Sequence, residues 1–141
     1  MPRGESVTAY LADTSVLTRM YRPVVAAAVS ELGDVRFSPI GALEYLFQAS
    51  NQRQWDDLGV VLAGFDRQPW GDAERVFERA DEVQRLLAAS GLKGRRVPDL
   101  IIAAHAELAG LTVLHYDADF DHIGSVTAQP TEWVVERGSV D

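Results

Sequence analysis

The segment over residues 97–123 constrains the fold most, because it joins an apolar helix to a short apolar strand. Pro98 suits the first turn of a helix that Gly110 ends. Residues 100–104 are apolar nearly all round the helix, which is typical of a crossover helix buried between parallel strands. A strand is expected over residues 112–114, and several acidic side chains follow it.

Short apolar runs alternate with helical patterns along the rest of the chain. Strands are expected at 7–12 and 35–37, with an edge strand at 68–70 and a final strand or hairpin over 126–128 and 131–135. Helices are expected at 16–20, 23–32, 39–50, 53–65 and 72–90. The pattern predicts a three-layer α/β fold with a central, mainly parallel sheet flanked by helices. A chain of 141 residues with 47% hydrophobic content fits a single domain over 1–141.

Composition limits the classes of function. The chain has no cysteine, which excludes disulfides, thiolate catalysis and cysteine-based zinc sites. Residues 1–6 form no signal peptide and no later segment is long enough to span a membrane, so a cytoplasmic protein is expected. A net charge of −8 argues against a broad basic face for nucleic acid. Lys93, Arg95 and Arg96 form either a local basic patch beside Asp99 or a solvated loop.

Three aspartates lie where a parallel sheet gathers functional groups. Asp13 directly follows the first strand, and Asp117 follows the strand at 112–114. Asp99 lies in the first turn of the helix that leads into that strand. Because the carboxyl ends of parallel strands form a crevice where the strand order reverses, we expect these side chains to converge. Each also has an ordinary alternative role, as a helix cap, a partner of the helix dipole or part of a solvated turn.

Glu44 is the fourth acid, on the helix expected at 39–50. Its spacing puts it on the same helix face as Ile40, Leu43 and Phe47. An acid on an apolar face is unfavourable unless a partner compensates its charge, so we expect Glu44 to join the aspartates. The alternative is that Glu44 lies at the edge of the apolar face and extends its carboxylate into water.

An all-carboxylate site suits Mg²⁺ or Mn²⁺, which accept a few protein oxygens and keep several waters. Zinc is disfavoured because none of the histidines has paired spacing with other ligands; these are His105, His115 and His122. The aspartates at 117, 119 and 121 match the opening of a calcium-binding loop. That interpretation fails, because His122 replaces the required glycine and Ala128 the bidentate glutamate.

These motifs together resemble the PIN-domain ribonucleases, and within them the VapC-type toxins of bacterial toxin–antitoxin pairs. The resemblance covers nearly the whole chain and rests on the order of four motifs: LADTS at 11–15, Glu44, PDLIIAA at 98–104 and DADF at 117–120. It implies a PIN-like fold and Mg²⁺- or Mn²⁺-dependent endoribonuclease activity. The implied catalytic quartet is Asp13, Glu44, Asp99 and Asp117.

The resemblance also implies more detailed roles. Asp13, Asp99 and Asp117 would hold the metal, with Asp119 as an accessory acid and Thr14 or Ser15 as a supporting or substrate-contacting hydroxyl. Asp121 is more simply structural. His115 departs from the family pattern, in which Thr or Ser often stands at this position, and a buried strand-end role is favoured for it over catalysis.

The partners that the resemblance implies are RNA, a second copy of the chain and a small VapB-like antitoxin. The negative charge suits a basic antitoxin, and apolar residues of the early helices would either line its groove or pack in the core: Val24, Val25, Leu43 and Phe47. A catalytically silent PIN-like binding module is one alternative function. A receiver-like phosphotransfer domain is another, disfavoured because Lys93, the only lysine, follows no strand.

Overall fold

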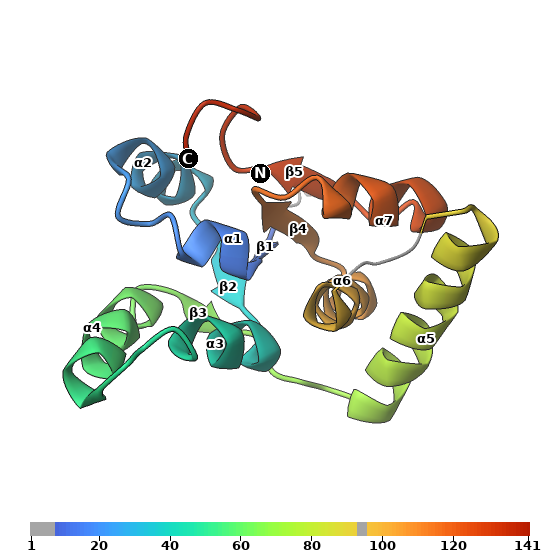
Figure 1. Cartoon of the computed structure of the whole chain (residues 1–141), viewed down its shortest axis with the longest axis horizontal. Helices are drawn as coiled ribbons and strands as arrows, with labels where there is room; N and C mark the ends of the chain where they lie inside the picture. Colours follow the sequence, from blue (N-terminus) through green and yellow to red (C-terminus); the bar gives the residue numbers. More distant parts are fainter. Residues whose placement is uncertain (1–7, 93–95) are drawn as a thin grey trace, which may run out of the picture.

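A parallel β-sheet lies between two groups of helices in the computed structural model, which describes residues 8–92 and 96–141 (Figure 1). The strands in the described residues are β1 (Tyr10–Ala12), β2 (Val35–Phe37), β3 (Asp66–Arg67), β4 (Thr112–His115) and β5 (Thr131–Trp133). Their order across the sheet is β3-β2-β1-β4-β5, and every neighbouring pair is parallel. The predicted three-layer α/β fold is confirmed.

The helices cover both faces of the sheet. They are α1 (Thr14–Leu17), α2 (Pro23–Leu32), α3 (Pro39–Leu46), α4 (Gln52–Leu62), α5 (Ala73–Ala89), α6 (Val97–Ala109) and α7 (Asp119–Thr127). Side chains alternate across each strand. Leu11 and Val113 therefore join the core against α5, α6 and α7, whereas Tyr10 and Leu114 join the core on the opposite face against α1 and α2.

Helix α6 is buried, as its apolar sequence predicts. Every residue from Asp99 to Ala106 is buried, including Ile102 and Ala104 with no exposed surface. Pro98 lies in its first turn, and Gly110 ends it in the left-handed conformation at φ 73°. The helix leads directly into β4, which pairs with the central strand β1 in register from Tyr10↔Thr112 to Ala12↔Leu114. The carboxyl ends of β1 and β4 are therefore level.

Two predicted strands are wrong. The edge strand expected at 68–70 is instead β3 at Asp66–Arg67, and the ladder ends before Pro69, which has no N–H to donate. Residues 126–128 form no strand and no hairpin, because they end helix α7 and Ala128 closes it in the left-handed conformation at φ 62°. Strand β5 pairs in parallel with β4.

The apolar face assigned to the third helix is also wrong. Helix α3 ends at Leu46 rather than 50, and it buries Gly41 and Tyr45. Leu43 is 68% exposed and Phe47 87% exposed, so these residues do not face the core. The early helices divide in the same way, because Val25 is fully buried whereas Val24 is 52% exposed. Spacing alone does not say which side of a short helix meets the rest of the protein.

Other boundaries differ by a few residues. The strand expected from residue 7 begins at Tyr10, and residue 7 lies outside the described residues. Helices expected at 16–20 and 53–65 are α1 and α4, each shifted towards the N-terminus, where Asp13 and Asn51 cap them through their side chains. In the described ranges no helix is both long and apolar enough to cross a membrane.

Phe120→Ala is predicted to lower the free energy of unfolding by about 3–5 kcal/mol, because Phe120 is completely buried in helix α7 and its loss leaves a cavity. Phe47→Ala is the matched control, since this ring is mostly exposed, and should change stability by less than about 0.5 kcal/mol. Urea unfolding of both variants at one protein concentration measures the difference. Equal losses would contradict the core position of Phe120.

Candidate active site

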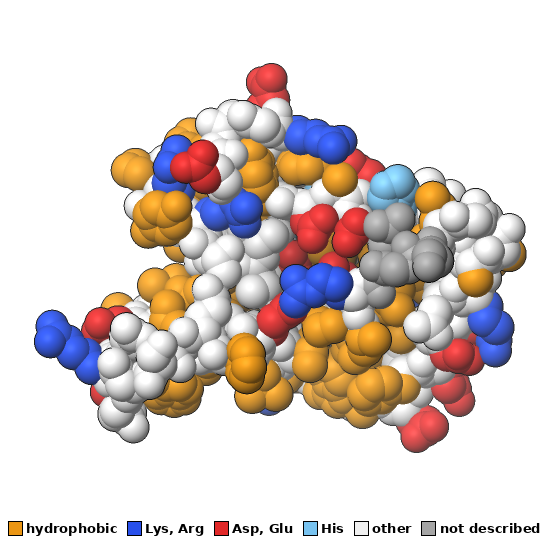
Figure 2. Space-filling model, in the orientation of Figure 1, with side chains coloured by type: hydrophobic (Ala, Val, Ile, Leu, Met, Phe, Trp, Pro, Cys, Tyr) orange, Lys and Arg blue, Asp and Glu red, His pale blue; other side chains and the backbone are white. Residues whose placement is uncertain are grey.

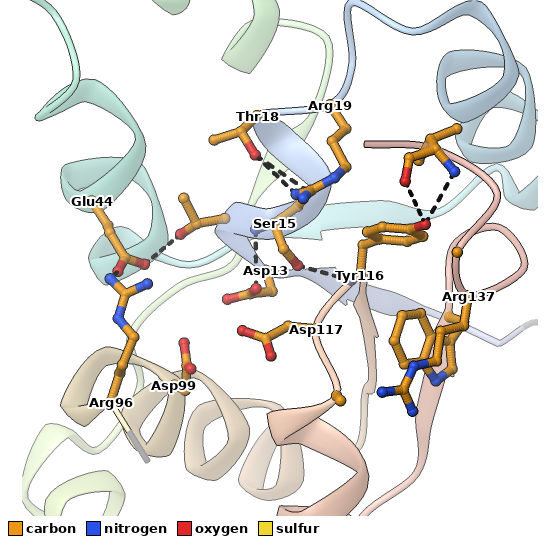
Figure 3. Close-up of a pocket in the computed structure, with 15 residues that line it drawn as sticks. Asp13, Ser15, Thr18, Arg19, Glu44, Arg96, Asp99, Tyr116, Asp117 and Arg137 are labelled. Atoms are coloured by element: carbon orange, nitrogen blue, oxygen red, sulfur yellow. Dashed lines mark hydrogen bonds and ion pairs between the residues drawn. The ribbon is translucent and has the colours of Figure 1, made fainter. Parts of the chain in front are cut away.

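A pocket of about 610 Å³ opens at the carboxyl ends of β1 and β4. Four acids from different elements line it: Asp13 after β1, Glu44 on α3, Asp99 on α6 and Asp117 after β4. Figure 3 shows the three aspartates pointing towards one another, with Glu44 to one side. Figure 2 shows acidic side chains gathered in the hollow of this face, with basic side chains beside them. The predicted convergence of the four acids is present.

Asp13 is held between the sheet and helix α1. Its N–H donates to the Leu114 carbonyl at 2.9 Å, and its Oδ2 accepts from the Ser15 N–H at 3.0 Å as the helix cap. The residue is 2% exposed, and Oδ1 has no hydrogen-bond partner among the described residues. Burial raises the pKa of Asp13 to about 6. The capping role and the pocket role therefore coexist, one on each carboxylate oxygen.

Asp99 is the acid in the least favourable position for a charge. It lies in the first turn of α6 and is 2% exposed, and its Oδ2 is buried without a partner in the described structure. Burial, followed by the negative charges of Asp13 and Asp117, raises the pKa of Asp99 to about 8. A cation at this position would relieve the repulsion between the carboxylates, and the unpartnered Oδ2 of Asp99 would serve as one of its ligands.

Glu44 points into the pocket from the buried side of α3, and its side chain is 15% exposed. Its Oε1 accepts from the Thr14 hydroxyl at 2.6 Å, and its Oε2 forms an ion pair with Arg96. Arg96 belongs to the predicted basic patch; Lys93 and Arg95 lie outside the described residues. Glu44 therefore does meet the aspartates, as predicted. The argument for that prediction was wrong, because Leu43 and Phe47 face outward and Glu44 does not share a buried apolar face with them.

Asp117 lines the pocket just after β4, and Asp119 begins helix α7 two residues later. Asp117 Oδ1 accepts from the Asp119 N–H at 2.9 Å, which fixes the turn before α7. Carboxylate oxygens meet within 4.8 Å in two sets that share Asp99: one with Asp13 and Glu44, the other with Asp117 and Asp119. Two such sets, with unpartnered buried oxygens at Asp13 and Asp99, fit a hard divalent cation.

His115 is completely buried and does not reach the pocket. Its ring lies 5.2 Å from the Phe120 ring and 5.0 Å from the Trp133 ring, and its Nδ1 accepts from the Asp117 N–H at 3.2 Å. Burial lowers the pKa of His115 to about 4, so the ring is neutral near pH 7. A neutral ring that accepts at Nδ1 carries its proton on Nε2. His115 thus supports Asp117 from behind.

Ser15, Asp121 and Trp133 lie around the acids without joining them. Ser15 Oγ accepts from the Tyr116 N–H at 2.8 Å, which ties α1 to the end of β4. Asp121 lies outside the acidic cluster, and its carboxylate accepts from Trp133 Nε1 at 3.3 Å. Trp133 is half-buried and lines the pocket.

Sequence reasoning missed the opposite wall of the pocket. Figure 3 shows Arg19, Tyr116 and Arg137 on that wall, and Trp133, Gly138 and Val140 also line the pocket. Arg137 and Trp133 come from the C-terminal part of the chain, where neither spacing nor charge density marks a site. An aromatic residue four positions before an arginine after a strand is too common a pattern to indicate function.

The chain matches known proteins over most of its length. The family model of the PIN domain matches residues 10–126. Ribonuclease VapC51 of Mycobacterium tuberculosis is 47% identical over 135 residues, which cover 94% of this chain and 97% of the relative. Ribonuclease VapC18 of the same organism is 39% identical, with 93% and 98% covered. The chain therefore belongs to the PIN-domain family. Its relatives place it in the VapC group of that family.

Solved structures agree with this fold. The structure of VapBC2 from Rickettsia felis, bound to a DNA fragment from its promoter, matches with a TM-score of 0.74 at 15% identity, covering 89% of this chain and 98% of that one. VapBC-1 from nontypeable Haemophilus influenzae matches with a TM-score of 0.71 at 17% identity, covering 92% and 100%. The family assignment rules out the receiver-like alternative, since the match to the PIN domain covers both aspartate-bearing strand ends.

Asp99→Asn is predicted to stabilise the metal-free protein at high pH. The pKa of Asp99 is about 8 in the folded protein and near 3.8 in the unfolded chain, so the unfolded chain releases its proton first. Raising the pH from about 4 to about 8 therefore favours unfolding of the parent protein. Asparagine has no charge to bury, so the variant should melt a few degrees higher than the parent at about pH 8 in EDTA. Circular dichroism during heating measures this.

The advantage of the variant should shrink as the pH falls from about 8 towards 4, and it should vanish below about pH 3, where the Asp99 carboxyl group is protonated in both the folded and the unfolded state. Asp57→Asn is the control, because Asp57 is an exposed acid on α4 away from the pocket. A gain in melting temperature that is the same for both variants, or the same at every pH, would contradict the electrostatic conflict at Asp99.

Proposed function

We propose that this chain is a metal-dependent endoribonuclease, the toxin of a toxin–antitoxin pair, built as a single PIN-like domain over residues 1–141. The observation that carries the proposal is the pair of carboxylate sets that share the buried Asp99, with the oxygens of each set within 4.8 Å of one another, in a chain whose relatives are named ribonucleases. A silent binding module has no need to bury Asp13 and Asp99 with unpartnered oxygens.

Asp13, Asp99 and Asp117 are the proposed metal ligands, with Asp119 as an accessory acid. These residues offer oxygen atoms alone, which favours Mg²⁺ or Mn²⁺ over softer metals. A bound divalent cation would neutralise charge on the scissile phosphate and lower the pKa of a water molecule. The carboxylates by themselves would repel an RNA phosphate. Binding of the phosphate beside them therefore needs the cation that they hold.

Glu44 is the proposed group that orients the attacking water. The Thr14 hydroxyl fixes one oxygen of its carboxylate, and Arg96 contacts the other. Each carboxylate oxygen has two acceptor sites, so both can still accept a hydrogen bond from water. Thr14 therefore acts as a positioning residue, and Ser15 holds α1 against the end of β4 through the Tyr116 N–H.

The proposed partners follow from the surface and from the named relatives. Tyr21, Val24, Leu43 and Phe47 are exposed apolar residues on or beside the early helices, and a short antitoxin segment or a second copy of the chain would cover them. Structures with the same fold are VapBC complexes, which supports a VapB-like antitoxin for this chain. The net charge of −8 favours a basic segment. RNA as substrate implies that the chain acts in the cytoplasm.

Cleavage of RNA by the purified protein tests the proposal. Mg²⁺ or Mn²⁺ should support cleavage, EDTA should abolish it, and Asp13→Asn or Asp99→Asn should lower the rate by at least about 100-fold through loss of a metal ligand. Asp57→Asn is the control and should cleave at the parent rate. Growth and RNA integrity after induction in a bacterial host provide the cellular measurement. Full cleavage in EDTA, or equal toxicity of the parent and Asp13→Asn, would refute the proposal.

His115→Phe is predicted to weaken metal binding while keeping the fold. Phenylalanine retains the ring packing against Phe120 and Trp133 but cannot accept the Asp117 N–H. Loss of such a supporting contact should raise the Mn²⁺ concentration needed for half-maximal binding by about 10-fold or more. Isothermal titration with Mn²⁺ measures this, and His115→Asn, which keeps an acceptor, should recover part of the affinity. Unchanged affinity in His115→Phe would show that His115 only fills space.

A further inference from the structure

The two walls of the pocket carry opposite charges. Acids from β1, α3, α6 and the turn after β4 form one side, whereas Arg19 and Arg137 lie on the other beside Tyr116 and Trp133 (Figure 3). A strand of RNA has a phosphate at every nucleotide, so a site that cleaves one phosphodiester bond also has to accommodate the next phosphates. In a chain of net charge −8, those neighbouring phosphates need a nearby cation.

The side chain of Arg19 is occupied by contacts within the protein. Its Nη1 donates to the Ser15 carbonyl at 2.8 Å, and its Nε donates to the residue 141 carbonyl at 2.6 Å. Its guanidinium carbon lies 4.8 Å from the centroid of the Tyr116 ring. The Tyr116 hydroxyl in turn donates to the Val140 carbonyl at 2.8 Å. These contacts fasten residues 140–141 to α1 and β4, and they leave Arg19 with a structural role.

Arg96 is also engaged, because it forms an ion pair with Glu44 at the far side of the pocket. Arg137 differs from both arginines. It is exposed, and no carboxylate among the described residues pairs with it. Its guanidinium carbon lies 5.4 Å from the centroid of the Trp133 ring, a distance at which the ring attracts the cation. Arg137 is thus a cation that faces the pocket with its hydrogen-bond donors available.

Trp133 is a rigid support for this cation. Its indole Nε1 donates to both oxygens of Asp121 at 3.3 Å, and its ring lies 5.0 Å from the His115 ring and 5.4 Å from the Tyr116 ring. The exposed Arg137 side chain would otherwise sample many rotamers. Contact with a fixed indole limits that freedom, which favours bidentate binding of an acceptor such as phosphate by the planar guanidinium.

We propose that Arg137, supported by Trp133, binds the RNA phosphate adjacent to the scissile one. The inference rests on the proposed ribonuclease function and adds the course of the substrate: the RNA backbone runs from the acidic cluster towards β5. Arg137 is a substrate-binding residue, not a catalytic one, because it lies on the wall opposite the carboxylates. The contact is made to the backbone, so it applies to every RNA sequence.

The test measures binding separately from cleavage. All binding variants carry Asp99→Asn, so that the RNA is not cleaved during the measurement, and Mg²⁺ is present. The probe is a fluorescein-labelled single-stranded RNA of mixed sequence, about 20 nucleotides long. Adding Arg137→Gln should raise the dissociation constant by about 10-fold, as expected for loss of one charge-assisted phosphate contact. It should also reduce the slope of log Kd against log salt concentration by about 0.7. Arg137→Lys should recover the slope but only part of the affinity.

Arg53→Gln is the matched control, because Arg53 is exposed on α4, forms no ion pair within the described residues and lies outside the pocket. It should leave both quantities unchanged. In the cleavage-competent protein, Arg137→Gln should lower kcat/KM through KM. Equal binding by the Arg137→Gln and Arg53→Gln variants, with normal cleavage by the wild-type protein, would overturn the inference and leave the ribonuclease function intact. Failure of the wild-type protein to cleave or bind any RNA would overturn both.

Discussion

The mutual repulsion of buried carboxylates at the crevice between β1 and β4 is the constraint on which the rest of the structure depends. Asp99 belongs to both sets of converging carboxylate oxygens, and its pKa of about 8 reflects its burial and its acidic neighbours. Such an arrangement persists only if the surrounding fold is stable enough to impose it. Helix α6 meets that need, because every residue from Asp99 to Ala106 is buried between the sheet and α5 and α7.

The acids are held in place by neighbouring groups, and Asp13 and Asp99 each keep one buried oxygen without a partner among the described residues. Asp13 uses one oxygen to cap α1, Glu44 uses one to accept from Thr14, and Asp117 uses one to accept from the Asp119 N–H. Fixed carboxylates lose little further freedom when a cation binds, which favours both affinity and a defined geometry. The proposed metal site is therefore arranged by ordinary local contacts: a helix cap, a side-chain hydrogen bond and a turn.

The charge of the protein is distributed to suit this site. A net charge of −8 would repel RNA from the surface as a whole, yet the wall opposite the acids carries Arg19 and Arg137 on aromatic supports. His115 links the two walls, since its ring packs on Trp133 while its Nδ1 accepts the Asp117 N–H. A change in the aromatic cluster would thus reach a proposed metal ligand through a single hydrogen bond.

The sequence by itself determined the layered fold, the buried helix at 97–109 and the aspartates at the ends of two strands, because these follow from local periodicity and from the geometry of parallel sheets. Helix α7 was not predicted, because its acidic first turn also suits a loop. Its packing through Phe120 and Ile123 depends on residues distant in the sequence. Only the tertiary structure decided that α3 turns Glu44 inward while Leu43 and Phe47 face outward. Only it brought Trp133 and Arg137 to the pocket. The physical reason is that periodicity reports which residues share a face, whereas long-range packing decides what that face meets.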